Sequence, residues 1–496
     1  MTTVVDEQMW GTPQRVRPPP NPLGASLRRV GMVLVVTGVL VDLSIQTRAG
    51  GLAATAAVVC LCVGLMVAGR VVRPGGRLLL AAVIVVASFL FLRSSPWLVA
   101  IDLATVSMLI ALACSAERDR RPFDTRFVGL TRRLWATACS IVTAPPRAAA
   151  ALASLLPRGT HAARRVLWQV VRGLVFAVPI LAIIGVSLAS ADPVFASLFD
   201  LDLDVGSIVP HVVIAALGMW LAAGFFVQAS CPPVAEHRGT HTVGAVEGLV
   251  VMTGLTGLYG VFAASQVVVA RRGADYVLET TGLTYAEYAR SGFFQLLWVA
   301  AITVVLLVSL RSIVRLDTAA ARRSFAAVGV VAALSTVVIV HSAVVRLGLY
   351  DDVFGLTRLR FYSAAFAWWL GAVFVLVAGA MACSAASRRS GRDWLLTAIA
   401  CSAVMAVVIL NLVDPDATVV QHNLARAQDG APFDVDYARA LSSDATPVLA
   451  GAVDSLTAVE GDSLRADLCP PPSLDGPIGW NVSLWRAADA TEQLCG

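Results

Sequence analysis

The chain has 496 residues, of which 57% are hydrophobic and only 14% are charged, and its formal net charge is +5. Soluble domains are about 45–50% apolar, so this composition excludes an ordinary soluble fold and indicates a polytopic membrane protein. The positive charge does not indicate nucleic-acid binding, because the arginines gather beside the apolar runs, where the orientation of membrane helices accounts for them.

Long apolar runs recur along the chain and predict membrane-spanning helices. A helix needs about 20 residues to cross the hydrocarbon core, and over such lengths only a helix satisfies its own backbone hydrogen bonds in lipid. We therefore predict an all-α polytopic bundle of about eleven spans, of which the run at 77–92 is the shortest and the least secure. The predicted spans are 29–46, 51–69, 77–92, 96–115, 172–191, 206–228, 244–270, 293–310, 323–345, 360–384 and 393–413.

The arginines predict the orientation of these spans. Arg28 and Arg29 precede the first span, and further arginines gather in every second connection along the chain. Because basic connections stay in the cytoplasm, the N-terminus is expected inside and the C-terminus outside. The predicted regions are a disordered cytoplasmic tail (1–25), four spans (26–115), a basic amphipathic cytoplasmic segment (116–171), a seven-helix membrane domain (172–413) and an extracytoplasmic helical tail (414–496).

The segment 116–171 mixes arginines with large apolar residues such as Trp135 and Trp168. Basic helices with an apolar stripe lie in membrane interfaces and favour anionic lipid, so we expect the lipid bilayer, and anionic lipids in particular, as partners of this segment. Nucleic-acid binding is the alternative, and it is less economical because arginines are expected beside membrane spans in any case.

The connection Val345–Tyr362 carries an unusual density of charge for a chain of this composition. Its charged residues are Arg346, Asp351, Asp352, Arg358 and Arg360. Arginine is disfavoured in outer connections, so these three arginines need local carboxylate partners. The nearest candidates are Asp351, Asp352 and the acidic loop at 192–204.

The chain turns polar after Asp414. Three stretches with proline or aspartate near their starts predict short amphipathic helices at 414–430, 434–443 and 445–458. Cys469 and Cys495 stand apart from the other cysteines and are expected to form a disulfide in an oxidising exterior, with two free thiols as the alternative. The disulfide supports the outside location of the tail, since it needs an oxidising compartment.

Four stretches resemble an uncharacterised family of bacterial multi-pass membrane proteins of unknown function, the DUF4153/DUF4173 type. They are ASADPVFASLF (189–199), GADYVLETTGLTYAEYARSGFFQL (273–296), RLGLYDDVFGLTRLRFY (346–362) and NLVDPDATVVQHNLAR (411–426). The chain departs mildly at Asp414-Pro415-Asp416, where the family more often has Asn-Pro-Asp. The resemblance covers the second half of the chain and implies a protein of the bacterial cytoplasmic membrane, but it implies no activity.

Several polar residues are predicted in or near one leaflet. Asp102 lies about two turns inside the fourth span, where an acid costs about 2.5–3.5 kcal/mol to insert and is a functional hypothesis by default. Together these residues predict an outward-facing vestibule for an anionic headgroup or small solute, with a structural salt-bridge lattice as the alternative. The candidate binding residues are Asp102, Asp192, His211, His341, Arg346, Asp351, Asp352, Arg358 and Arg360.

The sequence offers no convincing metal or catalytic set. His237 and His241 lie near Cys231, but a fourth ligand is not evident and Gly239 weakens a helix there. No phosphate-binding or nucleophile motif occurs, so no cofactor is expected and an outer-leaflet enzyme is the least favoured function. The leading hypothesis is transport or handling of a small solute or lipid through the vestibule. The alternative is a membrane scaffold or sensor subunit that binds a protein partner through its outer loops and tail.

Overall fold

The computed structural model describes residues 27–47, 50–116, 127–145, 147, 173, 184, 188, 205–230, 243–281, 292–386, 394–469, 476–477 and 479–495. Over these ranges the fold is all-α, as predicted. The helices of the bundle are α1 (Leu27–Gln46), α2 (Gly51–Val67), α3 (Pro74–Leu92), α4 (Pro96–Ala116), α9 (Val205–Ser230), α10 (Ala245–Thr281), α12 (Phe293–Ile313), α13 (Ala319–Phe354), α14 (Arg358–Ala386) and α15 (Leu395–Val413).

The lengths of the described helices confirm a multi-pass membrane protein. Nine of them are long and apolar enough to cross a bilayer, and α2 is an apolar helix of 17 residues. The least secure predicted span, 77–92, belongs to α3, which has 19 residues because Pro74 starts the helix at its N1 position. All but three residues of the predicted span at 172–191 lie outside the ranges given above, so the count of about eleven stays a prediction.

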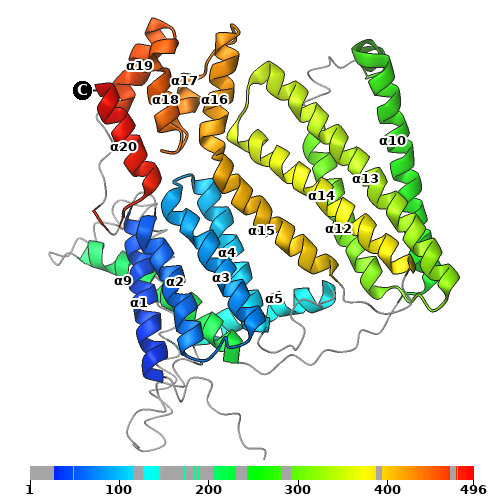
Figure 1. Ribbon diagram of the computed structural model, residues 1–496, viewed down its shortest axis with the longest axis horizontal. Coiled ribbons are helices and arrows are strands. Elements are labelled where there is room, and N and C mark those ends of the chain that lie inside the picture. The colour runs from blue at the N-terminus through cyan, green and yellow to red at the C-terminus, as the bar shows by residue number, and fades with distance from the viewer. Residues whose placement is uncertain are drawn as a thin grey trace, which may run out of the picture.

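The membrane helices pack into two groups with separate hydrophobic cores (Figure 1). Helices α1–α4 and α9 surround one core, and helices α10, α12, α13 and α14 surround the other. Helix α15 belongs to both, because Leu395 near its start is buried in the second core and Val407 near its end is buried in the first. This helix therefore connects the two groups and carries the chain to the polar tail.

The polar tail folds into a helical appendage, residues 414–495, at one end of the bundle (top of Figure 1). It consists of α16 (Pro415–Gln428), α17 (Val435–Arg439), α18 (Thr446–Ala452), α19 (Ala458–Leu468) and α20 (Val482–Cys495). The three predicted short helices are present as α16, α17 and α18. The appendage has a hydrophobic core of its own, formed by Val420, Phe433, Ala438, Ala445, Leu449, Val453 and Leu464.

Helix α5 (Phe127–Val142) lies at the opposite end of the bundle from the appendage (Figure 1). One face packs on α9, where the indole N–H of Trp220 donates to the Ile141 carbonyl at 2.7 Å and Ser140 Oγ donates to Gln228 Oε1 at 2.7 Å. The other side exposes Trp135. This part of the basic segment is therefore a helix packed along the bundle, and the amphipathic cytoplasmic character of the whole segment stays a prediction.

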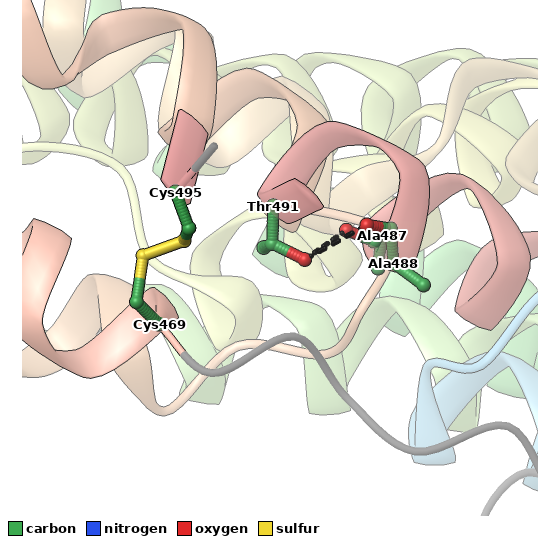
Figure 2. The surroundings of a disulfide bond; sticks show 5 residues. All are labelled: Cys469, Ala487, Ala488, Thr491 and Cys495. Carbon is green, nitrogen blue, oxygen red and sulfur yellow. Dashed lines mark hydrogen bonds between the residues drawn. A yellow bond between two sulfur atoms is a disulfide. The ribbon is translucent and has the colours of Figure 1, made fainter. Parts of the chain in front are cut away.

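A disulfide joins Cys469, just after α19, to Cys495 at the end of α20, which confirms the predicted pairing (Figure 2). Thr491 lies one turn before Cys495 on α20, is buried, and donates from its hydroxyl to the carbonyls of Ala487 and Ala488 (Figure 2). The face of α20 that carries Thr491 therefore packs against the rest of the appendage. The disulfide closes a loop of 26 residues around it.

Replacing both Cys469 and Cys495 with serine is expected to destabilise the appendage by about 2–4 kcal/mol, because the loop between them is no longer closed in the unfolded chain. Thermal unfolding of the purified protein measures the effect. Cys401→Ser, at an exposed thiol in α15, is the matched control and is expected to leave the midpoint unchanged. An unfolding midpoint that neither the double replacement nor reduction lowers contradicts this role.

Candidate functional site

The appendage starts at a turn that Asp414-Pro415-Asp416 imposes. A proline disfavours helical geometry in the residue before it, so α15 ends at Val413 and Asp414 takes a positive φ of 59°. Aspartate tolerates this region better than most residues. The Asp414 carboxylate accepts a hydrogen bond from the Ala417 N–H at 3.3 Å and caps α16. Asp416 is thereby placed in the first turn of α16.

Asp416 forms a buried ion pair with Arg358, the first residue of α14. The guanidinium donates from Nε to Oδ1 at 2.9 Å and from Nη2 to Oδ2 at 2.8 Å. Asp416 is fully buried, and its Oδ2 also accepts from the Ser442 N–H at 3.1 Å and from Ser442 Oγ at 2.5 Å. The Arg358 backbone N–H donates to the Tyr437 hydroxyl at 2.6 Å. Bidentate geometry of this kind fixes both partners in one orientation.

Helix α16 also holds the turn between α13 and α14. The Asn423 side chain accepts from the Leu356 N–H and donates to the Leu356 carbonyl, both at 2.8 Å. Arg426 donates to the Asp352 carbonyl at 2.8 Å. Gly355 has a φ of 77°, and a Cβ there would lie 2.6 Å from the Arg426 guanidinium, so only glycine fits.

A second set of contacts joins the appendage to the connection between α3 and α4. Arg93 donates from Nε to the Asn411 carbonyl at 2.8 Å, and its Nη1 forms an ion pair with Asp414 and lies 3.8 Å from Asp444 Oδ1. Asp444 Oδ2 accepts from the backbone N–H groups of Ser94 and Ser95, both at 2.9 Å. We call the five charged residues at this junction the appendage lock: Arg93, Arg358, Asp414, Asp416 and Asp444.

Helix α20 is tied to the bundle beside the lock. Asn481 Nδ2 donates to the Arg93 carbonyl at 3.1 Å, and Asn481 Oδ1 accepts from the Ser483 N–H at 2.9 Å. Trp480 stacks on Phe91 near the end of α3, with ring centroids 6.1 Å apart. Both ends of the appendage are therefore anchored on the bundle.

The lock is electrostatically unbalanced, because it holds three carboxylates and two guanidinium groups. The pKa of Asp414 is raised to about 6, mainly by burial and next by the nearby carboxylate of Asp444, whereas the Arg93 guanidinium opposes the rise. Asp414 lies just outside the span formed by α15.

Asp102 is fully buried in α4 and is linked to the lock through Asn411. Asn411 Nδ2 donates to Asp102 Oδ1 at 2.9 Å, and the Asn411 carbonyl accepts from Arg93. Asp102 Oδ2 and Asn411 Oδ1 are buried, and no residue that the structure describes offers either of them a hydrogen bond. This pair therefore retains hydrogen-bonding capacity that its described surroundings do not use.

The other arginines of the charged connection have partners of their own. Arg346 Nη2 donates to Gln266 Oε1 at 3.3 Å. The Arg360 guanidinium lies 4.1 Å from the centre of the Tyr350 ring, and its Nε is 3.8 Å from Asp351 Oδ1. Asp351 is thus the partner of Arg360, as the sequence suggested.

None of the remaining candidate binding residues that the structure describes belongs to the lock. His211 Nδ1 is 3.1 Å from Asp42 Oδ1 and 2.7 Å from Gln46 Nε2, between α9 and α1. His341 and Asp352 are exposed. Asp192 belongs to a stretch that the structure does not describe. The candidate residues that the structure describes are therefore spread over several separate places and do not line one vestibule.

Most of the lock was not anticipated from the sequence. Two signals could have pointed to it: Arg93 is an arginine in a short connection that the predicted orientation places outside, where basic residues are disfavoured, and Asp414-Pro415-Asp416 puts two carboxylates directly after a span. The possible metal ligands Cys231, His237 and His241 lie outside the described residues. Elsewhere, in the part of the chain that the structure covers, no group of three or more metal-ligating side chains occurs.

Fold and lock define a polytopic helical membrane protein with an anchored extramembrane appendage. Residues 80–452 match the family model described as Domain of unknown function (DUF4153), and the chain belongs to this family. The matched region includes all five residues of the lock, whereas α19, α20 and the disulfide lie beyond it. Neither the curated proteins nor the solved structures contain a match.

Arg358→Ala is expected to destabilise the junction by about 3–5 kcal/mol, because it leaves the Asp416 carboxylate buried without its cation. The control is Arg439→Ala, which removes an ion pair with Asp467 in a far more exposed place and is expected to cost at most about 1 kcal/mol. Thermal unfolding and the hydrogen-exchange protection of α16 amides report the difference. Equal effects of the two variants contradict a dominant role for the lock.

Asp102→Asn is expected to preserve stability, since an amide oxygen still accepts from Asn411 and the new amide N–H offers a donor for the unused Asn411 Oδ1. Asp102→Leu, of similar size, is expected to cost about 1–3 kcal/mol because the Asn411 amide group loses one of its two acceptors and keeps only the Val407 carbonyl. Unfolding midpoints of the two variants test this. An asparagine variant as unstable as the leucine variant shows that the carboxylate itself is required.

Proposed function

We propose that this protein is a membrane scaffold or sensor subunit that presents its appendage to a protein partner outside the bilayer. The observation that carries the proposal is the lock, in which the charged groups nearest to the appendage are bonded to one another. Arg358 binds Asp416 bidentately, and Arg93 bridges Asp414 to the Asn411 carbonyl. A transport vestibule needs polar groups that can exchange partners with a solute, whereas these contacts hold the appendage in one orientation.

The surface of the appendage supports a role in partner binding. Val459 on α19 is 81% exposed, and Trp485 on α20 is 49% exposed. Exposed aromatic and aliphatic side chains on a rigid helical support are typical anchors of protein interfaces. The bundle, in contrast, exposes the apolar side chains that lipid covers.

We extend the proposal to orientation and location. The appendage lies outside and the basic segment 116–171 lies in the cytoplasm, against anionic lipids of a bacterial cytoplasmic membrane. Two observations support this: the appendage and α5 are at opposite ends of the bundle, and the disulfide is compatible with an oxidising exterior. The excess of arginine in alternate connections is consistent with the same orientation.

Transport or handling of a small solute or lipid is the second candidate, and one observation favours it. Asp102 and Asn411 are buried within the spans and each keeps an oxygen that the described residues do not engage. Polar groups at membrane depth often mark the route of an ion or solute. The proposal gives this function second place because Asp102 is fully enclosed.

A photo-crosslinking amino acid at Val459 is expected to give an adduct with a protein partner in intact cells, because this side chain is 81% exposed on the appendage. The matched control position is Val261, 72% exposed on α10, where lipid adducts are expected. Mass spectrometry of the purified adduct identifies the partner.

The partner adduct is expected to be lost in Arg358→Ala and kept in Arg439→Ala, provided both variants reach the membrane in equal amounts. Two results contradict the scaffold proposal: no protein adduct at Val459, or an adduct that survives the loss of Arg358 unchanged.

A further inference from the structure

The appendage lock has one carboxylate that lacks a cation of its own. Asp416 has Arg358, and Arg93 is shared between Asp414 and Asp444. Two guanidinium groups therefore neutralise two of three carboxylates, of which Asp416 and Asp444 are buried and Asp414 is half-buried. An unbalanced buried charge is costly, and the usual remedy is to bind a proton. A proton on one carboxylate leaves a balanced cluster of two cations and two anions.

Hydrogen bonds show which carboxylate is the least stabilised as an anion. Asp416 accepts two bonds from Arg358 and two from Ser442. Asp444 accepts from the N–H groups of Ser94 and Ser95 and lies within reach of the Ser94 and Ser442 hydroxyls. Asp414 has only Arg93 and a 3.3 Å bond from Ala417. Each hydrogen bond to a carboxylate favours its ionised form, so the proton belongs on Asp414.

We propose that the appendage lock is a proton-binding site centred on Asp414, and that release of this proton weakens the hold of the bundle on the appendage. The ligand of the site is a proton taken from the solution on the appendage side, so the pH of that solution sets how far the site is occupied. The inference goes beyond a scaffold function and holds whether or not a partner binds.

The surroundings of Asp414 bring charges from four directions. Arg93 approaches from the end of α3, and Asp444 from the turn before α18. Asp416 lies in the first turn of α16, which Asp414 caps, and is paired with Arg358 of α14. On the side of α15, Asn411 connects to the carboxyl group of Asp102. The groups that face Asp414 directly are one cation, Arg93, and two anions, Asp416 and Asp444.

The direction of the pH effect follows from the raised pKa of Asp414. In the folded protein the pKa is about 6, against an ordinary value of 3.8. A carboxyl group whose pKa is raised by folding stabilises the folded state fully below its ordinary pKa, and this contribution is lost as the pH rises through the folded pKa. The lock is therefore tightest at acidic pH and loosens between about pH 4 and pH 6.

Hydrogen exchange of the full-length protein in lipid nanodiscs tests the proposal. The protection factors of α16 amides, corrected for the intrinsic exchange rate at each pH, are expected to fall as the pH rises from 4.5 to 7.5, in a step near the pKa of Asp414. Asp414→Asn retains the capping oxygen and a residue type that tolerates positive φ, and it is expected to abolish the step. Asp434→Asn changes an exposed cap of α17 and is expected to keep it.

Asp444→Asn supplies an independent arm, in case Asp414→Asn perturbs the turn. Removing the neighbouring anion is expected to shift the step to lower pH, because the Asp444 charge opposes ionisation of Asp414. A flat profile in the wild type, or a step that persists unchanged in both Asp414→Asn and Asp444→Asn, overturns the proposal. Neither outcome bears on partner binding, so the scaffold function stands or falls separately.

Discussion

The arrangement of this protein depends on the ion pair between Arg358 and Asp416. A buried guanidinium and a buried carboxylate both lose water, and their mutual attraction does not by itself guarantee a gain in stability over apolar packing. What such a pair supplies is a single allowed geometry, because two parallel hydrogen bonds fix the planes of both groups. The Arg358 and Asp416 side chains come from the first turns of α14 and α16. Their pairing therefore sets the angle between the bundle and the appendage.

The other contacts of the junction depend on the pairing of Arg358 with Asp416. Once α16 is held at its start, Asn423 and Arg426 on the same helix meet the turn between α13 and α14. Helix α15 ends at Val413, three residues before Asp416, and contributes to both hydrophobic cores of the bundle. Helix α15 therefore connects both cores to the lock, because Asp414 directly follows its last residue. A change in the relative position of the two cores is therefore expected to move Asp414.

The sequence was sufficient for the parts of this structure that depend on local composition. Apolar runs predicted the membrane helices, because burial in lipid leaves the backbone few alternatives. Pairing of Cys469 with Cys495 was predictable because these cysteines stand alone in a polar tail. The charge of the 345–362 connection was a correct indication that its arginines need partners, and the pairing of Arg360 with Asp351 was within reach because both lie in that connection.

The decisive pairing was not predictable in the same way. Asp416 lies 58 positions beyond Arg358, with the rest of α14 and all of α15 between them, and no pattern along the chain links the two residues. The predicted partner loop at 192–204 was the more obvious acidic segment, and the structure does not describe it. Asp102 was singled out for its position inside a span, but its partner Asn411 carried no signal of its own. Contacts of this kind are set by how helices pack, which composition does not encode.

The central claim is that the lock holds the appendage in one fixed orientation on the bundle. The most direct measurement is the distance distribution between two spin labels, one at Val459 on α19 and one at Leu78 on α3, both exposed. Labels attached through non-natural amino acids leave the Cys469–Cys495 disulfide intact. The account predicts one narrow distribution in the native protein and a broad one in Arg358→Ala. A distribution that is already broad in the native protein, or that stays narrow without Arg358, contradicts it.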